Sequence, residues 1–186
     1  MTEHPSGPRR TGPVPHDPEN EDLIDAKRLR GIAHPLRLRI LWSLREQGPS
    51  TATKLANALG ESSGATSYHL RQLAAYGFVV EDAGRGTERE RWWRAAKRGS
   101  TLELPPADDH EGRVLTGEYL HTVANLYSER MHRVIDAIPT AEPEWVEAGT
   151  LSDIILRLTA TESEQLIADL FALANRYRRH DVPNPP

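Results

Sequence analysis

One short segment of the sequence carries side chains suited to contact nucleic acid. The spacing of apolar residues predicts a helix from about Ser63 to Gly77 with an inner face at Thr66, Leu70 and Leu73. Arginine and glutamine on the outer face can pair with guanine or adenine, serine hydroxyls reach phosphate or base, and a tyrosine ring can cover a thymine methyl. We predict that the outward residues of this helix contact DNA: Ser63, Ser67, Tyr68, Arg71 and Gln72.

A second basic feature follows directly along the chain. Residues 78–82 and 88–94 have the composition of two strands, and the glycine-containing stretch 83–87 between them favours a tight turn. Strand alternation predicts that one of the adjacent Trp92 and Trp93 faces inward and the other outward. A glycine turn can approach the sugar-phosphate backbone closely, so we predict phosphate contacts from the arginines of this hairpin: Arg85, Arg89 and Arg91.

The charge of the chain is distributed unevenly. The 186 residues carry a formal net charge of −4, which taken alone argues against a nucleic-acid partner. Residues 27–98, however, hold 14 Lys and Arg against 6 Asp and Glu, while the rest of the chain holds 9 against 21. The positive segment coincides with the helix and hairpin described above, so we expect this face to meet DNA and the remainder to be repelled from it.

Periodic apolar residues predict three further helices before the predicted DNA-contacting helix, over about 22–33, 36–48 and 51–60. Pro35 ends the first helix and suits the first turn of the second. We expect His69 to be a structural hydrogen-bonding residue at the base of its helix. The fold class we predict is mainly α with a β-hairpin wing: a winged helix-turn-helix followed by a long dimerisation helix and a C-terminal α/β segment.

The long helix is predicted over residues 113–138 from an apolar 4-3-4-3-4 spacing. An unbroken alternation of this kind is the seam by which one helix packs on another. We therefore predict that it mediates dimerisation through the residues of that seam: Leu120, Ala124, Tyr127, Met131, Val134 and Ile138.

Proline- and glycine-rich stretches separate these pieces. The last piece combines an extended apolar run at 153–158 with a helix opened by a capping-box pattern near Thr161. We predict the following organisation: 1–18 a disordered arm, 19–98 a winged helix-turn-helix domain, 99–112 a linker, 113–138 the dimerisation helix, and 145–180 a C-terminal strand-helix segment.

Three stretches of the sequence together resemble the ArsR family of bacterial winged-helix transcription regulators: residues 29–41, with His34-Pro35-Leu36-Arg37, then Leu55-Ala56, then residues 67–79, with Ser67-Tyr68-His69-Leu70. The resemblance covers about residues 22–96, and the helix at 113–138 by position. It implies a homodimer that binds an inverted-repeat operator in double-stranded DNA and usually represses. It also implies that the first helix joins the helix after the wing in the dimer interface.

Members of this family often sense metals, and the chain departs from both common patterns. It has no cysteine, which excludes the thiolate type. The type with one Asp and three His on the helix after the wing is half present as His121 and His132, but Tyr119 and Ile135 occupy the other positions. Two imidazoles are a poor zinc site, so we predict no metal and keep His121 and His132 as weak candidates.

An alternative is a sensor in which a small molecule or a metal switches DNA binding. Its ligand site would lie between the 113–138 helix and the C-terminal segment, lined by Trp145, Tyr119, Tyr127, Met131 and His132. The sequence contains no P-loop, dinucleotide fingerprint or zinc-protease motif, so we predict neither an enzyme nor a cofactor. No apolar run is long enough to cross a bilayer, and we expect a cytoplasmic protein that does not bind membranes.

Overall fold

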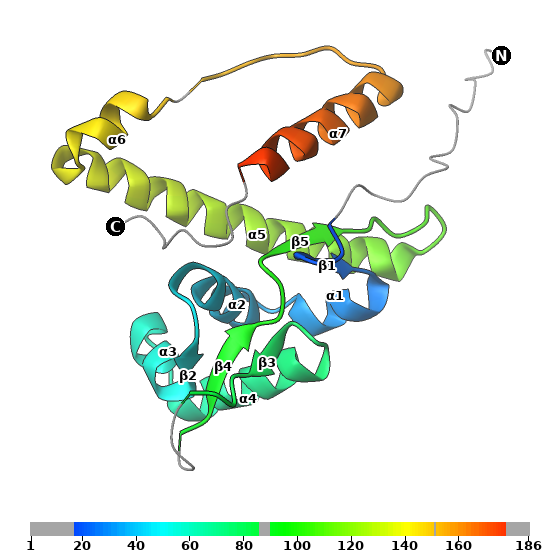
Figure 1. Ribbon diagram of the computed structural model, residues 1–186. Helices are drawn as coiled ribbons and strands as arrows, with labels where there is room; N and C mark the ends of the chain where they lie inside the picture. Colours follow the sequence, from blue (N-terminus) through cyan, green and yellow to red (C-terminus); the bar gives the residue numbers. More distant parts are fainter. Residues whose placement is uncertain (1–16, 86–89, 151, 178–186) are drawn as a thin grey trace.

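The computed structural model describes residues 17–85, 90–150 and 152–177, and its first part is a winged helix (Figure 1). This part consists of four helices and a three-stranded antiparallel sheet of strand order β2-β4-β3. The predicted fold class, mainly α with a β-hairpin wing, is therefore confirmed. The elements of this part are α1 (Ala26–Ile32), α2 (Pro35–Gln47), β2 (Ser50–Thr51), α3 (Ala52–Leu59), α4 (Ser63–Ala75), β3 (Val79–Glu81) and β4 (Trp92–Ala95).

Side-chain caps determine where these helices begin. His34 accepts a hydrogen bond at Nδ1 from the backbone N of Leu36, at 3.2 Å, and Pro35 occupies the first turn of α2 as expected. Thr51 caps α3, and the Oγ of Ser62 accepts from the backbone N of Ala65, at 3.1 Å, to cap α4. These caps orient α3 and α4 as the two helices of a helix-turn-helix.

The core of the winged helix is apolar and closely packed. Gly31 is needed within it, because a methyl group at this position would overlap the ring of Tyr76. The buried apolar residues come from every helix of the domain, from the wing, and from the long helix that follows: Ile24, Leu29, Ile32, Leu36, Leu38, Ile40, Leu41, Leu44, Leu55, Leu70, Leu73, Phe78, Val79, Trp93, Tyr119 and Leu126.

A second, two-stranded sheet joins the start of the domain to the segment after the wing. β1 (Glu21–Ile24) pairs in parallel with β5 (Gly99–Leu102), which corrects the prediction of a helix start and a linker at these positions. Asp22 is only 2% exposed and accepts hydrogen bonds from Nη2 of Arg28, at 2.5 Å, and from Nη2 of Arg45, at 3.0 Å. Two opposite charges therefore compensate the buried carboxylate.

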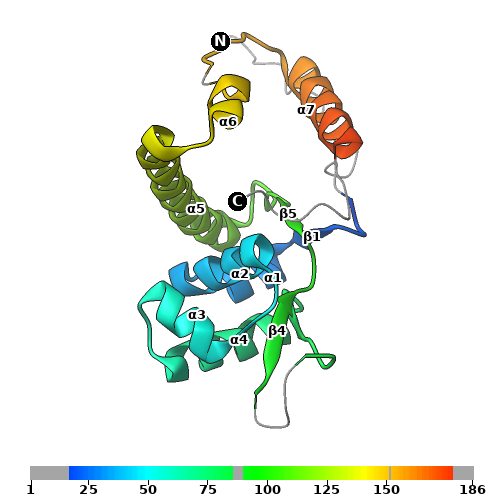
Figure 2. The same ribbon diagram turned by 60° about the vertical axis from the view of Figure 1, so that its left-hand side comes forward.

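The long helix α5 (His110–Ala137) presents one face to the winged helix and another to solvent (Figures 1 and 2). It begins three residues before the predicted start, because Asp109 caps it by accepting from the backbone N of Gly112, at 2.9 Å. Thr116, Tyr119 and Leu126 are buried against the domain. The neighbouring stripe, which holds the predicted seam, is exposed.

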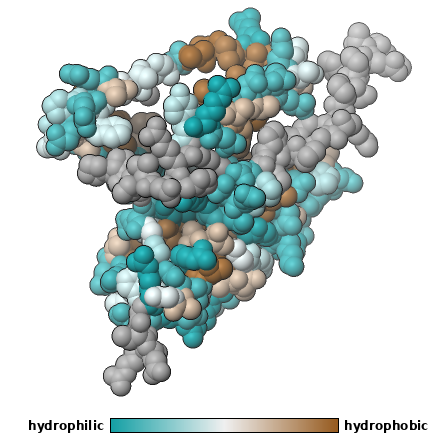
Figure 3. Space-filling view, viewed as in Figure 1, coloured by the Kyte–Doolittle hydropathy of each residue, from teal (hydrophilic) through white to brown (hydrophobic). Residues whose placement is uncertain are grey.

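The C-terminal part differs from the prediction. A short 3-10 helix (Ile138–Thr140) and α6 (Pro143–Ala148) follow α5, and α7 (Ala160–Arg176) begins at a capping box formed by Thr159 and Glu162. The strand expected at 153–158 is not formed, because these residues have no partner strand in the described part of the chain. Its apolar side chains are exposed, and apolar surface gathers over the connection between α6 and α7 at the top of Figure 3.

Candidate nucleic-acid interface

Helix α4 has one buried and one exposed face. Thr66, Leu70 and Leu73 are each 0% exposed and fix the helix against the core, and the hydroxyl of Thr66 donates to the backbone O of Ser62 at 3.0 Å. On the other face Tyr68 and Arg71 are exposed, as is Ser63, while Ser67 and Gln72 are half-buried. The wing and α4 lie at the end of the molecule away from α6 and α7 (Figures 1 and 2).

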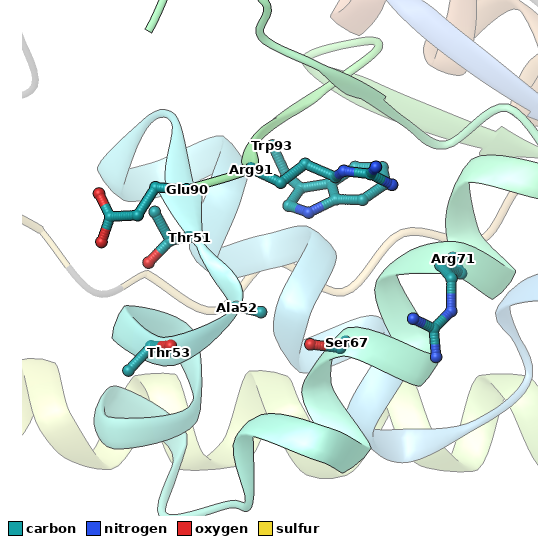
Figure 4. Close-up of a pocket in the computed structure, with 8 residues that line it drawn as sticks. All are labelled: Thr51, Ala52, Thr53, Ser67, Arg71, Glu90, Arg91 and Trp93. Carbon is teal, nitrogen blue, oxygen red and sulfur yellow. The ribbon is translucent and has the colours of Figure 1, made fainter. Parts of the chain in front are cut away.

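The structure brings three of the predicted DNA-contacting residues together. Ser67 and Arg71 of α4 and Arg91 of the wing line one open, polar hollow of about 390 Å³. Thr51 and Thr53 approach it from the start of α3 (Figure 4). The other predicted residues of α4 lie apart from this hollow: Ser63, Tyr68 and Gln72 are not among the residues that line it.

The wing arginines are exposed and paired with acidic neighbours. Nε of Arg85 lies 3.3 Å from Oδ2 of Asp82, and Nε of Arg91 lies 3.5 Å from Oε1 of Glu81. Exposed ion pairs of this kind are weak, so both guanidinium groups can exchange their partners for phosphate at small cost. The third predicted residue, Arg89, lies outside the described residues. As predicted, the two tryptophans of β4 face opposite ways, one buried and one half-buried.

The positive segment also contains arginines that are not available to DNA. Arg45 donates to Asp22, to the backbone O of Gly99 at 2.7 Å and to that of Lys97 at 3.0 Å. The guanidinium of Arg28 lies over the Phe78 ring and bonds Asp22. Counting charge along the sequence therefore overstates the charge that faces a ligand.

Residues that sequence reasoning missed add to this surface. Thr51 and Thr53 precede and open α3, where backbone N–H groups favour anions. The ammonium of Lys54 lies 4.4 Å from the centre of the Trp92 ring, which holds it near the wing. Arg94 is exposed on β4. Two features of the sequence could have identified these residues. Thr51 is a capping residue type at the start of α3, and strand alternation in β4 places Arg94 on the outward face.

A histidine pair supports α4 from beneath. The rings of His34 and His69 lie 4.4 Å apart between centroids, and Tyr68 meets His69 edge-on at 5.2 Å. Burial, and then the positive charge of Arg37, lowers the pKa of His34; burial, His34 and Arg37 lower the pKa of His69. The hydrogen bond expected of His69 is not seen: among the described residues its buried Nδ1 has no partner, and its contacts are with the rings of His34 and Tyr68.

One sequence pattern of hydrolases does occur, at Gly60-Glu61-Ser62-Ser63-Gly64. In hydrolases the serine of this Gly-x-Ser-x-Gly pattern sits on a sharp turn between a strand and a helix. Here α3 precedes it, and the Oγ of Ser62 accepts a hydrogen bond as the cap of α4. The pattern is therefore explained by helix capping and gives no support for catalysis.

The predicted dimerisation residues lie on one exposed stripe that runs along α5 and ends at Ile138, the first residue of the following 3-10 helix. Leu120, Tyr127, Met131, Val134 and Ile138 are between 46% and 58% exposed, and Ala124 is exposed between them. The outer side of α1 offers a less apolar surface, with Ala26, Lys27 and Arg30 exposed.

The residues expected to line a ligand site are divided between two cavities. Tyr119 and Tyr127 line one of about 670 Å³ with residues of α2 and Phe171 of α7. Tyr127, Met131 and Trp145 line another of about 870 Å³ between α5 and α6. His132 lines neither and instead bonds the backbone O of Ser128.

The two weak metal candidates, His121 and His132, are both exposed. Within residues 17–85, 90–150 and 152–177, no three His, Cys, Asp or Glu side chains come together as a metal site would require. In the same ranges no helix is long and apolar enough to cross a membrane.

The capped helices α3 and α4 pack on one apolar core and are followed by a basic hairpin. This arrangement defines a winged helix-turn-helix protein. Residues 32–82 match the family model described as "Helix-turn-helix domain". The expected resemblance is confirmed for this part of the chain.

A curated relative agrees with this class. The chain is 48% identical over 61 residues to the HTH-type transcriptional regulator NmtR of Mycobacterium tuberculosis. The match covers 32% of this chain and 50% of NmtR, so the chain spans about half the length of the curated relative that it matches.

Similar solved structures include the YusO protein of Bacillus subtilis, at 14% identity and a TM-score of 0.35 over 82% of this chain and 81% of the other. A ZitR mutant of Lactococcus lactis has 16% identity and a TM-score of 0.33 over 78% and 75%.

Proposed function

We propose that the chain is a homodimeric, sequence-specific DNA-binding transcription regulator that acts in the cytoplasm, without enzymatic activity, as a repressor at an inverted-repeat operator. The observation that carries this proposal is the hollow shared by Ser67, Arg71 and Arg91, where base-contacting and phosphate-contacting side chains meet on one exposed surface. The helix-turn-helix match over residues 32–82 supports the same function.

The position of each residue on this surface decides whether we assign it a contact with bases or with phosphates. Helix α4 enters the major groove, because the groove is about 12 Å wide and admits one helix. Arg71, exposed and without an ion pair in the described part of the chain, bonds base edges. The wing then lies along the backbone, where Arg85, Arg91 and Arg94 neutralise phosphates. Thr53 adds a phosphate contact at the start of α3.

Dimerisation through α5 places two such surfaces side by side. The exposed stripe from Leu120 to Ile138 needs a partner, because a soluble chain rarely leaves so long an apolar seam open. The apolar groove between α5 and α6 continues the stripe through Met131, Val134 and Trp145, so a second copy also covers the groove. A two-fold axis across α5 then directs both α4 helices to the same side of a duplex.

The experiment that tests this function is the capture of genomic fragments bound by the full chain, followed by extraction of their shared motif. A two-fold dimer predicts a pseudo-palindrome with half-site centres about 34–36 Å apart, which is one turn of the duplex. Fragments without a shared motif would contradict sequence-specific binding, and a single asymmetric half-site would contradict the dimer.

A further inference from the structure

Helix α7 carries an apolar face that its own chain leaves largely uncovered. Ile167, Leu170 and Leu173 on this face are between 41% and 55% exposed. Phe171, at the edge of the face, lines the cavity against α2 and α5 of the same chain. A helix with one apolar and one polar side is stable when the apolar side is buried, so the described part of the chain does not supply the surface that α7 needs.

The groove between α5 and α6 is a surface of the matching kind. Its volume is about 870 Å³, and no residue of α7 is among the described residues that line it. An amphipathic helix binds such a groove through anchors spaced as Leu166, Leu170 and Leu173 are. The apolar residues of the groove are each between 49% and 56% exposed: Met131, Val134, Ile135, Ile138, Trp145 and Val146.

The connection between α6 and α7 is long enough to carry α7 to another molecule. It comprises the 11 residues 149–159. Fully extended, it spans about 36 Å, at about 3.3 Å for each residue. Residues 152–159 form no helix or strand, and Ile154 and Ile155 among them are 76% and 87% exposed (Figure 1). Flexible linkers are rich in glycine and serine, so these isoleucines indicate that the connection also lies against a second surface.

The charges of the two surfaces favour one orientation. Helix α7 has Glu164 near its start and Arg176 in its last turn. Arg133 is exposed on α5 beside the groove, and Glu144 and Glu147 are exposed on α6. With the start of α7 beside Arg133 and its end beside α6, opposite charges meet at both ends of the helix.

We propose that the two copies of the dimer exchange α7, so that the helix of each copy packs its apolar face into the α5–α6 groove of the other. In a single chain the helix and the groove stay apart (Figure 2), although the connection is long. Two-fold symmetry makes the exchange reciprocal, so one assembly covers both grooves and both helices. The exchange rests on the proposed dimer and names the segment that covers the groove.

The test is cross-linking between two full-length chains that carry different tags. The chain has no cysteine, so Leu170→Cys in one copy and Val146→Cys in the other place a single thiol on the helix and a single thiol on the groove. A short bis-maleimide tolerates differences in register that a disulfide does not. We expect a covalent heterodimer in severalfold higher yield than with Ala172→Cys, which replaces Leu170→Cys on the opposite side of α7.

Sedimentation of the same mixture separates the exchange from the dimer on which it rests. A dimer without the cross-link between residues 170 and 146 would overturn the exchange and leave the dimer standing. The same holds if Leu170→Cys chains cross-link to each other equally well. A monomer at every concentration would overturn both. In a chain that carries both cysteines, a cross-link confined to single chains would show that α7 occupies its own groove and would also overturn the exchange.

A charge on the apolar face of α7 provides a second measurement. Leu170→Glu should raise the dimer dissociation constant by about tenfold or more, because the exchange would bury an unpaired carboxylate. Ala172→Glu adds the same charge at an exposed position on the polar side of α7 and should leave that constant unchanged. Both sites are exposed in the single chain, so the fold of the chain is kept. Equal effects of the two variants would contradict the packing of this face.

Discussion

The winged helix buries its apolar side chains, whereas the C-terminal part of the molecule leaves many of its apolar side chains exposed. In the winged helix the apolar residues of four helices and the wing are buried in one core. Among the described residues of that part, Tyr68 is the one large apolar side chain that is exposed, and it lies on α4. From Leu104 onward exposed apolar residues are frequent, up to 87% exposure at Ile155.

This difference indicates which part of the molecule is complete in one chain. The winged helix buries its own apolar side chains in one core, so its exposed residues are free to serve recognition. The region from α5 onward has helices with apolar stripes that pack on little of the same chain, which is typical of segments that assemble with another copy. Four predictions test this contrast.

The largest difference concerns unfolding. Leu70→Ala, at a site that is 0% exposed, should lower the free energy of unfolding by about 2–5 kcal/mol. Leu170→Ala, at a site 55% exposed, should change it by less than about 0.5 kcal/mol at concentrations where the chain is monomeric. Denaturant unfolding measures both. Similar losses for the two variants would show that α7 is packed within the single chain.

The second prediction concerns assembly. Val134→Glu introduces a charge into the exposed seam and should raise the dimer dissociation constant about 100-fold or more, because a buried unpaired charge costs several kcal/mol. Asn125→Glu adds the same charge on the exposed side of α5 away from the seam and serves as the control. Sedimentation velocity distinguishes them, and equal behaviour of the two variants would rule out this seam as the interface.

The third prediction separates the two kinds of DNA contact. Arg71→Ala should weaken operator binding by about 1–3 kcal/mol and leave random DNA little affected. Arg85→Ala should weaken binding to both DNAs alike and reduce the slope against salt by about 1. Fluorescence anisotropy on an operator and a scrambled duplex measures each. If the two variants lose affinity in the same pattern, the assigned roles of α4 and the wing are incorrect.

The smallest effect is that of pH on the packing beneath α4. The pKa of His34 and of His69 is lowered in the folded chain, chiefly by burial and with Arg37 opposing protonation, while Glu61 acts weakly the other way. The unfolded chain therefore binds more protons just below pH 6.5, so this contribution to stability is present above that pH and is lost as the pH falls through the folded pKa.

His34→Asn tests this, because asparagine keeps the helix cap and removes one titrating group. Its stability should depend less on pH between 7 and 5 than that of the unsubstituted chain, and His121→Asn, at an exposed site of α5, should behave as the unsubstituted chain does. Thermal unfolding across these pH values measures the difference, and an unchanged pH dependence in His34→Asn would contradict the account.

Local signals predicted the helices and the wing well. Helical periodicity, Pro35, and the glycines that end α3 and α4 act over a few residues, and the structure follows them. The pairing of β1 with β5 joins segments far apart in sequence. The burial of Glu21 and Asp22 cannot be predicted from their residue types, because it depends on partners such as Arg28. The isoleucines of 153–158 have strand character, but a strand also needs a neighbour.

The candidate site was predictable in outline only. Surface position on α4 follows from helical period, which identified Ser67 and Arg71. Which positive charges face outward depends on tertiary ion pairs such as that of Arg45 with Asp22, and these cannot be derived from charge counts.

The most direct test of the central claim is the affinity of the dimer for its captured operator as a function of salt concentration. Release of counterions by several phosphate contacts in each half-site predicts that log K falls steeply with log salt, with a slope of about −4 or steeper. We expect that slope, with two chains bound per duplex. A slope near zero, or one chain per duplex at saturation, would contradict the account.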